Sequence, residues 1–407
     1  MKRLLVVNYP HMLIGGIEDY IYHLMRQQHE QGVDIIWLCD VNPKVAKEYQ
    51  DIIQSSIIRK VVINTHGLHW RENENIDFKG YDQVTILSFC LFDHLRAYEI
   101  AENRENVVLM YYVPHFRGGK IFSDEYSPKI CRKFYHNLVA KFYQIFDNDG
   151  SLRYFSKEHR EKLKETYGLT LDMSAERLIP EIRGEKLYDK ERCHRVYQNL
   201  EKTILCVTRF EFPHKGFLLG LIKDFEEISE KYKYLVLKII GYGADEKRVI
   251  EAIEALPMEI QKKVYMLGEA SPEKLDEYYK EAYLNVSVAG CAILGAKNSV
   301  VTLSPRHYSE ECEVYGFLSK SLPNYLLDKP GERILPYIDE LMEMSEEAYL
   351  ECCKASFEAI PQGELNPEYV FSMKTQSRKL SYFDMLAIKA LGLYKKISFK
   401  LKSHDRV

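Results

Sequence analysis

The sequence predicts an α/β protein with two doubly wound domains and a helical C-terminal section. Short, mainly apolar runs of strand length alternate with amphipathic stretches of helical length along most of the chain. This alternation stops near residue 181 and starts again near residue 203. Apolar strands separated by helices are typical of a parallel sheet that is covered on both faces. The length of 407 residues also favours two domains over one.

The first domain opens with a strand, a turn and a helix. An apolar strand at residues 4–7 precedes a turn at Gly15 and Gly16, and a helix is expected over 17–31. Further strands are expected at residues 33–38, 57–63, 83–88, 107–113, 144–146 and 152–155. A helix over 157–167 closes this half.

A charged segment separates the two halves. Residues 181–200 carry few apolar side chains, so we interpret them as the connection between domains. The alternation then resumes, with strands at 203–207, 235–240, 264–267, 284–288 and 299–303 and helices at 216–232, 245–256 and 272–280. After residue 331 the pattern is helical only, over 334–361 and from 367 onward. We therefore expect domains at residues 1–185 and 186–370, and a C-terminal helix over 371–407 that crosses back to the first domain.

The composition excludes several classes of function. A net charge of −4 and a pI near 6.4 do not suggest a nucleic-acid-binding protein. No apolar run reaches the roughly 20 residues that span a bilayer, and the N-terminus lacks the pattern of a signal peptide. The nine cysteines are scattered without a C-x-x-C pair, as in a protein of a reducing compartment. These features predict a cytoplasmic protein.

Two loops that follow strands of the second half carry the strongest chemical signal. In VTRFEFPHKG, Arg209 and Lys215 flank a loop that opens a helix at Gly216. Two cations beside a helix N-terminus suit a diphosphate, although a solvated basic loop is the simpler alternative. Gly241 and Gly243 follow the next strand. Because the carboxyl ends of parallel strands meet at one edge of a sheet, both loops are expected to line the same ligand site.

The order of these motifs resembles the nucleotide-binding half of the GT-B glycosyltransferases, and specifically the family 4-like group (glycosyl transferases group 1). The R-x-E-x-x-x-K-G loop, the G-x-G strand end and the segment YMLGEASPEKLDEYYKEAYLNVSVAG follow one another as in that family. The N-terminal GGIEDYIYHL also resembles the family's G-G-x-E motif. The resemblance covers about residues 1–320 and implies two Rossmann-like domains that face each other across a cleft.

The resemblance implies an enzyme that moves a hexose from a nucleoside diphosphate sugar, with a UDP-sugar favoured, to a glycan, lipid-linked or protein acceptor. It further implies retention at the anomeric carbon, no catalytic metal and no cofactor. Arg209 and Lys215 would neutralise the leaving diphosphate, and His115 would lie near the donor sugar unless it is an ordinary surface histidine. The glycines expected beside the donor or its nucleotide are Gly15, Gly16, Gly241 and Gly243, with a tight turn as the alternative for the first pair.

One departure concerns the E-x7-E motif, whose second glutamate holds the nucleotide ribose in the family. No glutamate occurs between Glu281 and Glu310, and Gly295 stands where the second one is expected. Glu310 and Glu311 follow the next strand and are candidates to replace it, with an exposed acidic loop as the alternative. The missing pair motivates a second hypothesis, a non-catalytic partner or chaperone of an active glycosyltransferase. A sugar-nucleotide epimerase is the third.

Two further signals have competing interpretations. Asp147-Asn148-Asp149 matches the D-x-D metal motif of the other glycosyltransferase architecture, but FDNDGS is also typical of a turn, and no metal site is expected. The C-terminal KKISFKLKSH is basic with interleaved apolar residues. It would either touch an anionic membrane surface, at the inner face of the membrane, or form a solvated helix end.

Overall fold

The computed structural model divides into two compact units. Unit 1 comprises Met1–Arg183 and Glu364–Val407, and unit 2 comprises Gly184–Gly363. The structure describes residues 1–13, 15–40, 42–54, 58–62, 76–101, 104–113, 129–154, 157–174, 177–179, 186–321, 330–360, 367–372, 380–387 and 390.

Unit 1 contains a six-stranded sheet in the order β3-β2-β1-β4-β5-β6, and all of its pairs are parallel. Its strands are β1 (Arg3–Asn8), β2 (Asp34–Cys39), β3 (Ile58–Val62), β4 (Gln83–Ser88), β5 (Val107–Val113) and β6 (Leu152–Tyr154). The order reverses between β1 and β4, which is the switch point of a doubly wound sheet.

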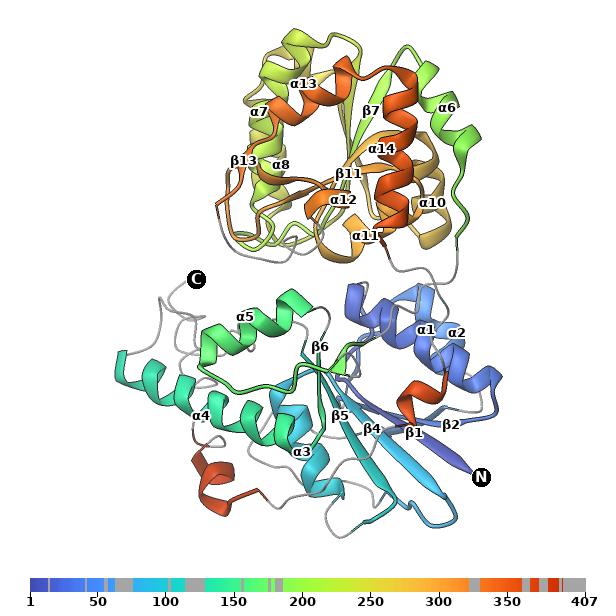
Figure 1. Ribbon diagram of the computed structural model, residues 1–407, viewed down its shortest axis with the longest axis vertical. Helices are drawn as coiled ribbons and strands as arrows, with labels where there is room; N and C mark the ends of the chain where they lie inside the picture. The colour runs from blue at the N-terminus through green and yellow to red at the C-terminus, as the bar shows by residue number, and fades with distance from the viewer. Residues whose placement is uncertain are drawn as a thin grey trace. The chain divides into compact units, whose positions relative to one another are not determined.

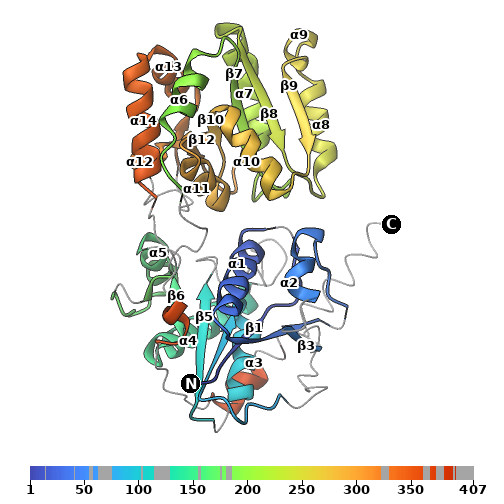
Figure 2. The ribbon, with the colours of Figure 1, turned by 90° about the vertical axis from the view of Figure 1, so that its right-hand side faces the viewer.

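Helices cover both faces of this sheet (Figures 1 and 2). They are α1 (Gly16–Glu30), α2 (Gln50–Gln54), α3 (Leu91–Ala101), α4 (Lys129–Asn148) and α5 (Lys157–Tyr167), with the 3-10 turn η1 (Lys47–Tyr49) before α2. Leu4 and Val6 of β1 pack in the same core as α3 and α4, whereas Leu5 and Val7 pack in the core that contains α1. Successive side chains of a strand point to opposite faces, which explains why residues 4–7 of β1 are apolar at every position.

One predicted strand of this half is wrong. Residues 144–146 lie inside α4, where Leu138, Phe142 and Phe146 recur at helical spacing and are buried against the sheet. The run QIF is too short for its apolar residues to distinguish a strand from a helix.

The chain returns to unit 1 at the 3-10 turn η4 (Pro367–Val370). There the Val370 carbonyl accepts a hydrogen bond of 2.8 Å from the Thr85 hydroxyl of β4. Residues 367–370 therefore lie with unit 1 and not with the second domain, where the sequence predicts them. The described part of the C-terminal helix expected after them comprises residues 371–372, 380–387 and 390.

Unit 2 contains a seven-stranded sheet in the order β13-β12-β11-β10-β7-β8-β9. Its parallel strands are β7 (Lys202–Val207), β8 (Leu235–Ile240), β9 (Val264–Gly268), β10 (Ala282–Val286) and β11 (Val301–Pro305). The antiparallel strands at one edge are β12 (Glu313–Phe317) and β13 (Glu332–Arg333). These two strands are not predicted from the sequence, because β13 has only two residues and β12, EVYGF, has no apolar run of strand length.

Helices also cover both faces of the unit 2 sheet. They are α6 (Lys190–Gln198), α7 (Phe217–Lys231), α8 (Glu246–Glu254), α9 (Met258–Gln261), α10 (Pro272–Glu281), α11 (Ala289–Lys297), α12 (Leu318–Ser321), α13 (Leu335–Glu343) and α14 (Glu346–Glu358). Figure 1 shows α7, α8 and α13 on one face and α6, α10 and α14 on the other.

The charged segment at 181–200 is more than a connection, because it contains α6. The Arg192 side chain of this helix is buried, and its guanidinium donates to the carbonyls of Tyr279 and Ser299 at 2.9 Å each. These bonds satisfy a buried charge that looks like a solvated one in the sequence.

The helix expected over 334–361 is interrupted. The Ser345 hydroxyl accepts a hydrogen bond from the Ala348 N–H and so begins α14 as a separate helix. Across the described part of the chain, no helix is long and apolar enough to span a bilayer.

Candidate active site

The loops after β7, β8 and β11 meet at the carboxyl edge of the unit 2 sheet. The Phe210 N–H donates to the Tyr242 carbonyl at 2.8 Å, and the Tyr308 N–H donates to the His214 carbonyl at 3.2 Å. The loops after β8 and β11 therefore hold the loop after β7, residues 208–216, in place through these hydrogen bonds. Open α/β sheets bind their ligands at this edge.

The predicted Gly241 and Gly243 allow this close approach. A Cβ atom at Gly241 would overlap the Thr208 carbonyl oxygen, and one at Gly243 would overlap the Phe210 carbonyl oxygen. The backbone after β8 thus lies directly against the backbone after β7, which only residues without a side chain permit. These glycines position the loop that carries the two cations; whether they also touch a nucleotide stays a prediction.

The two predicted cations, Arg209 and Lys215, lie on that loop. The Arg209 guanidinium lies 3.5 Å from a carboxylate oxygen of Glu211 in a partly exposed pair. Lys215 immediately precedes Gly216, the N-cap of α7. Desolvation lowers the pKa of the Lys215 ammonium to about 8, and the neighbouring Cys291 and Glu211 partly offset this shift. Within the described residues no carboxylate or carbonyl bonds directly to this ammonium, so an anionic ligand would stabilise its charge.

A stack of rings connects the loops after β7 and β11. The His214 ring stacks on Tyr308 with centroids 4.8 Å apart and on His307 with centroids 5.2 Å apart. Tyr308 has a φ of 59°, a left-handed conformation that is rare for a residue with a bulky side chain. The stack therefore fixes the loop segment directly before Lys215.

The two glutamates proposed to replace the family pair have different surroundings. The Glu310 carboxylate accepts a hydrogen bond of 2.9 Å from Arg248, whose guanidinium lies 5.2 Å from the centre of the Phe212 ring. The Glu311 carboxylate lies 3.9 Å from the Lys223 ammonium, and both side chains are mostly exposed. Glu310 is thus tied to the loop after β7, whereas Glu311 fits the alternative of an exposed acidic loop.

A buried network of hydrogen bonds lies beside Gly295, which stands where the resemblance predicts a second glutamate. A Cβ atom at Gly295 would overlap the side-chain amide of Asn285. The Asn285 amide nitrogen donates to the Thr302 hydroxyl at 3.2 Å, and the amide oxygen accepts from the Ser287 hydroxyl at 2.8 Å. The Ser287 hydroxyl in turn accepts from the Val207 N–H, at the end of β7, at 3.0 Å. A glutamate side chain has no room at residue 295 while Asn285 keeps this position.

Residues 190–291 match the protein-family model described as glycosyl transferases group 1. The matched segment runs from α6 into α11 and contains the loop after β7. This match supports a glycosyltransferase of group 1, and the fold is that of the GT-B glycosyltransferases. No curated protein matches it.

Solved structures share the fold of this glycosyltransferase at low sequence identity. A glycosyltransferase from Rickettsia africae has 15% identity and a TM-score of 0.55, over 91% of this chain and 96% of that one. Anabaena HepE, solved in complex with UDP and glucose, has 13% identity and a TM-score of 0.56, over 91% and 96%. Sucrose-phosphate synthase from Thermosynechococcus elongatus has 12% identity and a TM-score of 0.57, over 98% and 99%. These likenesses confirm the predicted fold class.

Gly295→Ala is expected to destabilise the glycosyltransferase by about 2–3 kcal/mol, because the added Cβ would overlap Asn285 in a buried network. Urea unfolding followed by circular dichroism measures the loss. The same substitution should cost much less in an Asn285→Ala background, since the overlapping amide is then absent. Equal costs in the two backgrounds would contradict the overlap.

The predicted glycine pair lies in unit 1. Gly15 is the N-cap of α1 and Gly16 is its first residue. The Gly15 carbonyl accepts a hydrogen bond of 2.8 Å from the Asp19 N–H, which is the first hydrogen bond of α1. Donor binding by this pair stays a prediction, and His115 lies outside the described residues.

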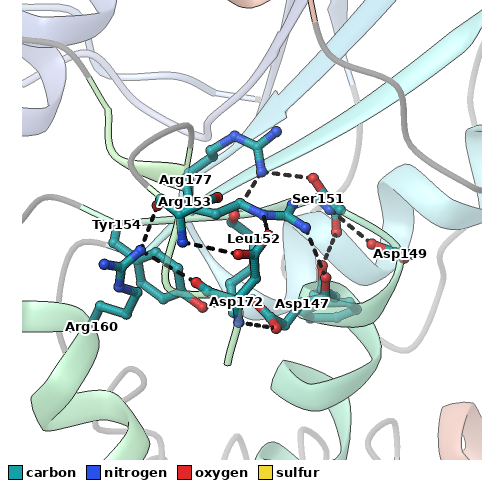
Figure 3. A network of polar contacts seen from close by, with 12 residues as sticks. Asp147, Asp149, Ser151, Leu152, Arg153, Tyr154, Arg160, Asp172 and Arg177 are labelled. Carbon is teal, nitrogen blue, oxygen red and sulfur yellow. Dashed lines mark hydrogen bonds and ion pairs between the residues drawn. The ribbon is translucent and has the colours of Figure 1, made fainter. Parts of the chain in front are cut away.

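The Asp147-Asn148-Asp149 motif ends α4 and is bonded within unit 1 (Figure 3). The Asp147 carboxylate accepts hydrogen bonds from the Tyr154 hydroxyl at 3.0 Å and from the Asp172 N–H at 2.8 Å. The Asp149 carboxylate accepts from the Ser151 N–H at 2.9 Å. Both aspartates are almost fully buried, so their oxygens hold the turn after α4. Within the described residues, no cluster of three or more His, Cys, Asp and Glu side chains suits a metal ion.

The sequence does not by itself indicate the side chains that hold in place the loops around Arg209 and Lys215. They are His214, Asn285, Ser287, Thr302, His307 and Tyr308. A partial signal exists for the network: LNVSV and VVTLS place polar residues within strands that are otherwise apolar. Buried polar groups require partners, so such residues indicate side chains that bond to one another.

Proposed function

We propose that this glycosyltransferase moves a hexose from a nucleoside diphosphate sugar, with a UDP-sugar favoured, to a glycan, lipid-linked or protein acceptor. The observation that carries the proposal is Lys215. The pKa of its ammonium is lowered. Lys215 lies at the end of the loop that carries Arg209, directly before the N-terminus of α7 at the carboxyl edge of the sheet. A diphosphate would supply the negative charge that stabilises this ammonium.

The proposed chemistry is neutralisation of the leaving group. Negative charge develops on the diphosphate as the bond to the sugar breaks, and preorganised cations stabilise that charge in the transition state. Arg209 would bind the phosphates through its planar fork, and Lys215 would add a compact charge. The positive end of the α7 helix dipole would lie beside the same phosphates. These groups would act without a metal ion or a cofactor, and we propose retention at the anomeric carbon.

The remaining predicted residues have proposed roles on the sugar side. We propose that unit 1 binds the acceptor, that Gly15 and Gly16 let its backbone approach the donor, and that His115 lies near the donor sugar. Glu310 is the proposed ribose ligand, since it is tied to the loop after β7. UDP-glucose is the first donor to test, because Anabaena HepE was solved with UDP and glucose.

Titration with UDP, GDP and ADP tests the proposal. A nucleotide at 100 times its Kd should stabilise the protein by about 2.7 kcal/mol, which is measured as a rise in Tm. Arg209→Ala should lose most of this rise. Lys247→Ala, at an exposed lysine of α8, should keep it. If no nucleotide raises the Tm of the wild-type protein, the proposed donor site is wrong.

A non-catalytic role is the second candidate, and the Asn285 network favours it, because it leaves no room at Gly295 for the glutamate that the resemblance predicts there. A partner or chaperone of an active glycosyltransferase would release no UDP from the donor. An epimerase would convert the donor without any acceptor. Product analysis of UDP-glucose incubated with and without an acceptor separates these functions from transfer.

We also propose a cytoplasmic location. Eight cysteines are free thiols among the described residues, as in proteins of a reducing compartment. The basic KKISFKLKSH segment would bring the protein to the inner face of the membrane. That segment lies outside the described residues.

A further inference from the structure

Helices α6 and α14 lie side by side in unit 2 (Figures 1 and 2), although most of the unit separates them in the chain. At one end of their contact, the Tyr197 and Tyr349 rings have centroids 5.5 Å apart. At the other end, the Tyr188 and Phe357 rings have centroids 5.9 Å apart. The two ring pairs fix how the helices face each other, and Cys193 lies between them.

Cys193 of α6 and Cys353 of α14 are a contacting pair of thiols. Both side chains are buried in the core of unit 2, and both are free thiols. Each thiol is a hydrogen-bonding neighbour of the other. A disulfide needs two cysteines whose side chains already point toward each other, and the packing of α6 on α14 supplies such a pair.

The surroundings make the two thiols chemically different. The hydrogen bond from Cys353 and the charge of the Arg192 guanidinium, 3.8 Å from the Cys193 sulfur, lower the pKa of the Cys193 thiol. Burial raises the pKa of the Cys353 thiol. Because the thiolate is the form that attacks an oxidant, Cys193 is the nucleophile of the pair and Cys353 is the second thiol.

The structure also tolerates loss of the Cys193 proton. As a thiol, Cys193 donates to the Ser299 carbonyl at 3.3 Å. The same carbonyl accepts a hydrogen bond of 2.9 Å from the Arg192 guanidinium. The carbonyl therefore keeps a partner when Cys193 becomes a thiolate or part of a disulfide, and no buried polar group is left without one.

We propose that Cys193 and Cys353 form a reversible redox-active pair whose disulfide ties α6 to α14. The oxidant is hydrogen peroxide. The Cys193 thiolate attacks the O–O bond, which gives a sulfenic acid and releases hydroxide. The Cys353 thiol then attacks that sulfur, so that the S–S bond forms and water leaves. Overall the two thiols lose two electrons and two protons, and the peroxide is reduced to two waters. In a reducing compartment the pair returns to thiols by exchange with a small thiol, which is oxidised in turn.

The position of the pair predicts what the disulfide does. Strands β7 to β13 all lie between residues 193 and 353 in the chain. A crosslink that closes a long loop restricts the unfolded chain most, so oxidation should stabilise unit 2. Cys193 bonds to Ser299 just before β11, which is the amino edge of the sheet, whereas the candidate active site lies at the carboxyl edge. Oxidation should therefore leave nucleotide binding unchanged, and this inference does not depend on the proposed function.

Peptide mapping of the oxidised full-length protein tests the pair. The reduced protein is treated with hydrogen peroxide, the remaining thiols are blocked with N-ethylmaleimide, and the peptides are analysed by mass spectrometry without reduction. We expect two peptides joined through Cys193 and Cys353. We also expect a rise in Tm of about 5–10 °C that dithiothreitol reverses.

Matched variants of the neighbouring cysteines sharpen the test. Cys193→Ala and Cys353→Ala should each lose the joined peptides and the rise in Tm on oxidation. Cys352→Ala, at a half-buried cysteine beside the pair, should keep both. Absence of the joined peptides from the oxidised wild-type protein would overturn the proposal, whatever the stability of the variants. An equal rise in Tm for oxidised Cys193→Ala would also overturn it.

Titration of both redox forms with UDP separates this proposal from the proposed function. If UDP raises the Tm but peroxide joins no peptides, the redox pair is wrong and the donor site stands. If the joined peptides form and no nucleotide stabilises either form, the redox pair stands and the donor site is wrong.

Discussion

Lys215→Met is expected to lower kcat/KM for sugar transfer by roughly 10²–10³-fold and, at pH 7, to raise the Tm of the protein. The activity falls because the variant lacks a preorganised cation beside the leaving diphosphate. The stability rises because the native protein holds this ammonium in a partly desolvated position. Initial rates of UDP release and thermal unfolding measure the two effects on the same preparations.

The pH dependence of both effects follows from the pKa of Lys215, which is lowered from 10.5 to about 8. Below pH 8 the ammonium is charged in the folded and unfolded states alike, and its desolvation costs stability in full. Between pH 8 and 10.5 the unfolded chain binds the proton and the folded protein does not, so stability rises with pH. The advantage of Lys215→Met should therefore be on the order of 1–2 kcal/mol at pH 7, allowing for partial exposure, and vanish near pH 10.5.

Wild-type transfer should decline as the pH rises through about 8, since the free enzyme then loses the charge on Lys215. Lys215→Arg keeps a cation and should shift this decline to higher pH. Lys247→Met, at an exposed lysine of α8, should change neither rate nor Tm. Transfer by Lys215→Met within threefold of the wild-type rate would remove Lys215 from the mechanism.

Gly241→Ala is expected to destabilise unit 2 by about 3 kcal/mol, because the new Cβ would overlap the Thr208 carbonyl oxygen and neither backbone has room to move. The backbone that carries Arg209 would shift with Thr208. A displacement of about 1 Å at a positioning group costs on the order of 10²-fold in rate. Denaturant unfolding and the rate of UDP release are the measurements.

Gly268→Ala is the matched control for this substitution. Gly268 has a φ of 69° and no atom within 4 Å of an added Cβ, so alanine there meets only the conformational cost of about 1 kcal/mol. If Gly241→Ala lowers the stability no more than Gly268→Ala does, the loops after β7 and β8 do not need this close approach.

The predicted fold was correct where the signal is local. The strands at 4–7 and 107–113 are wholly apolar and alternate with helices, so they could be found from the sequence and the loops after them placed on one edge. The strand at 144–146 was wrong because three apolar residues fit either period, and only burial of Phe142 and Phe146 against the sheet reveals the helix. The short edge strands β12 and β13 depend on each other and on β11, which no local pattern records.

The sequence by itself determined that this chain has two α/β halves and that Arg209 and Lys215 lie on a loop after a strand. Both follow from the spacing of apolar residues and from neighbours in the chain. Only the tertiary structure decided that Arg192 is buried and that the Asn285 side chain leaves no room for a side chain at Gly295. Those outcomes depend on partners far along the chain: Arg192 donates to Ser299, and Asn285 bonds to Thr302 across two strands. The free energy of a buried polar group is set by the partners that the fold brings to it, and the spacing of residues in sequence does not specify them.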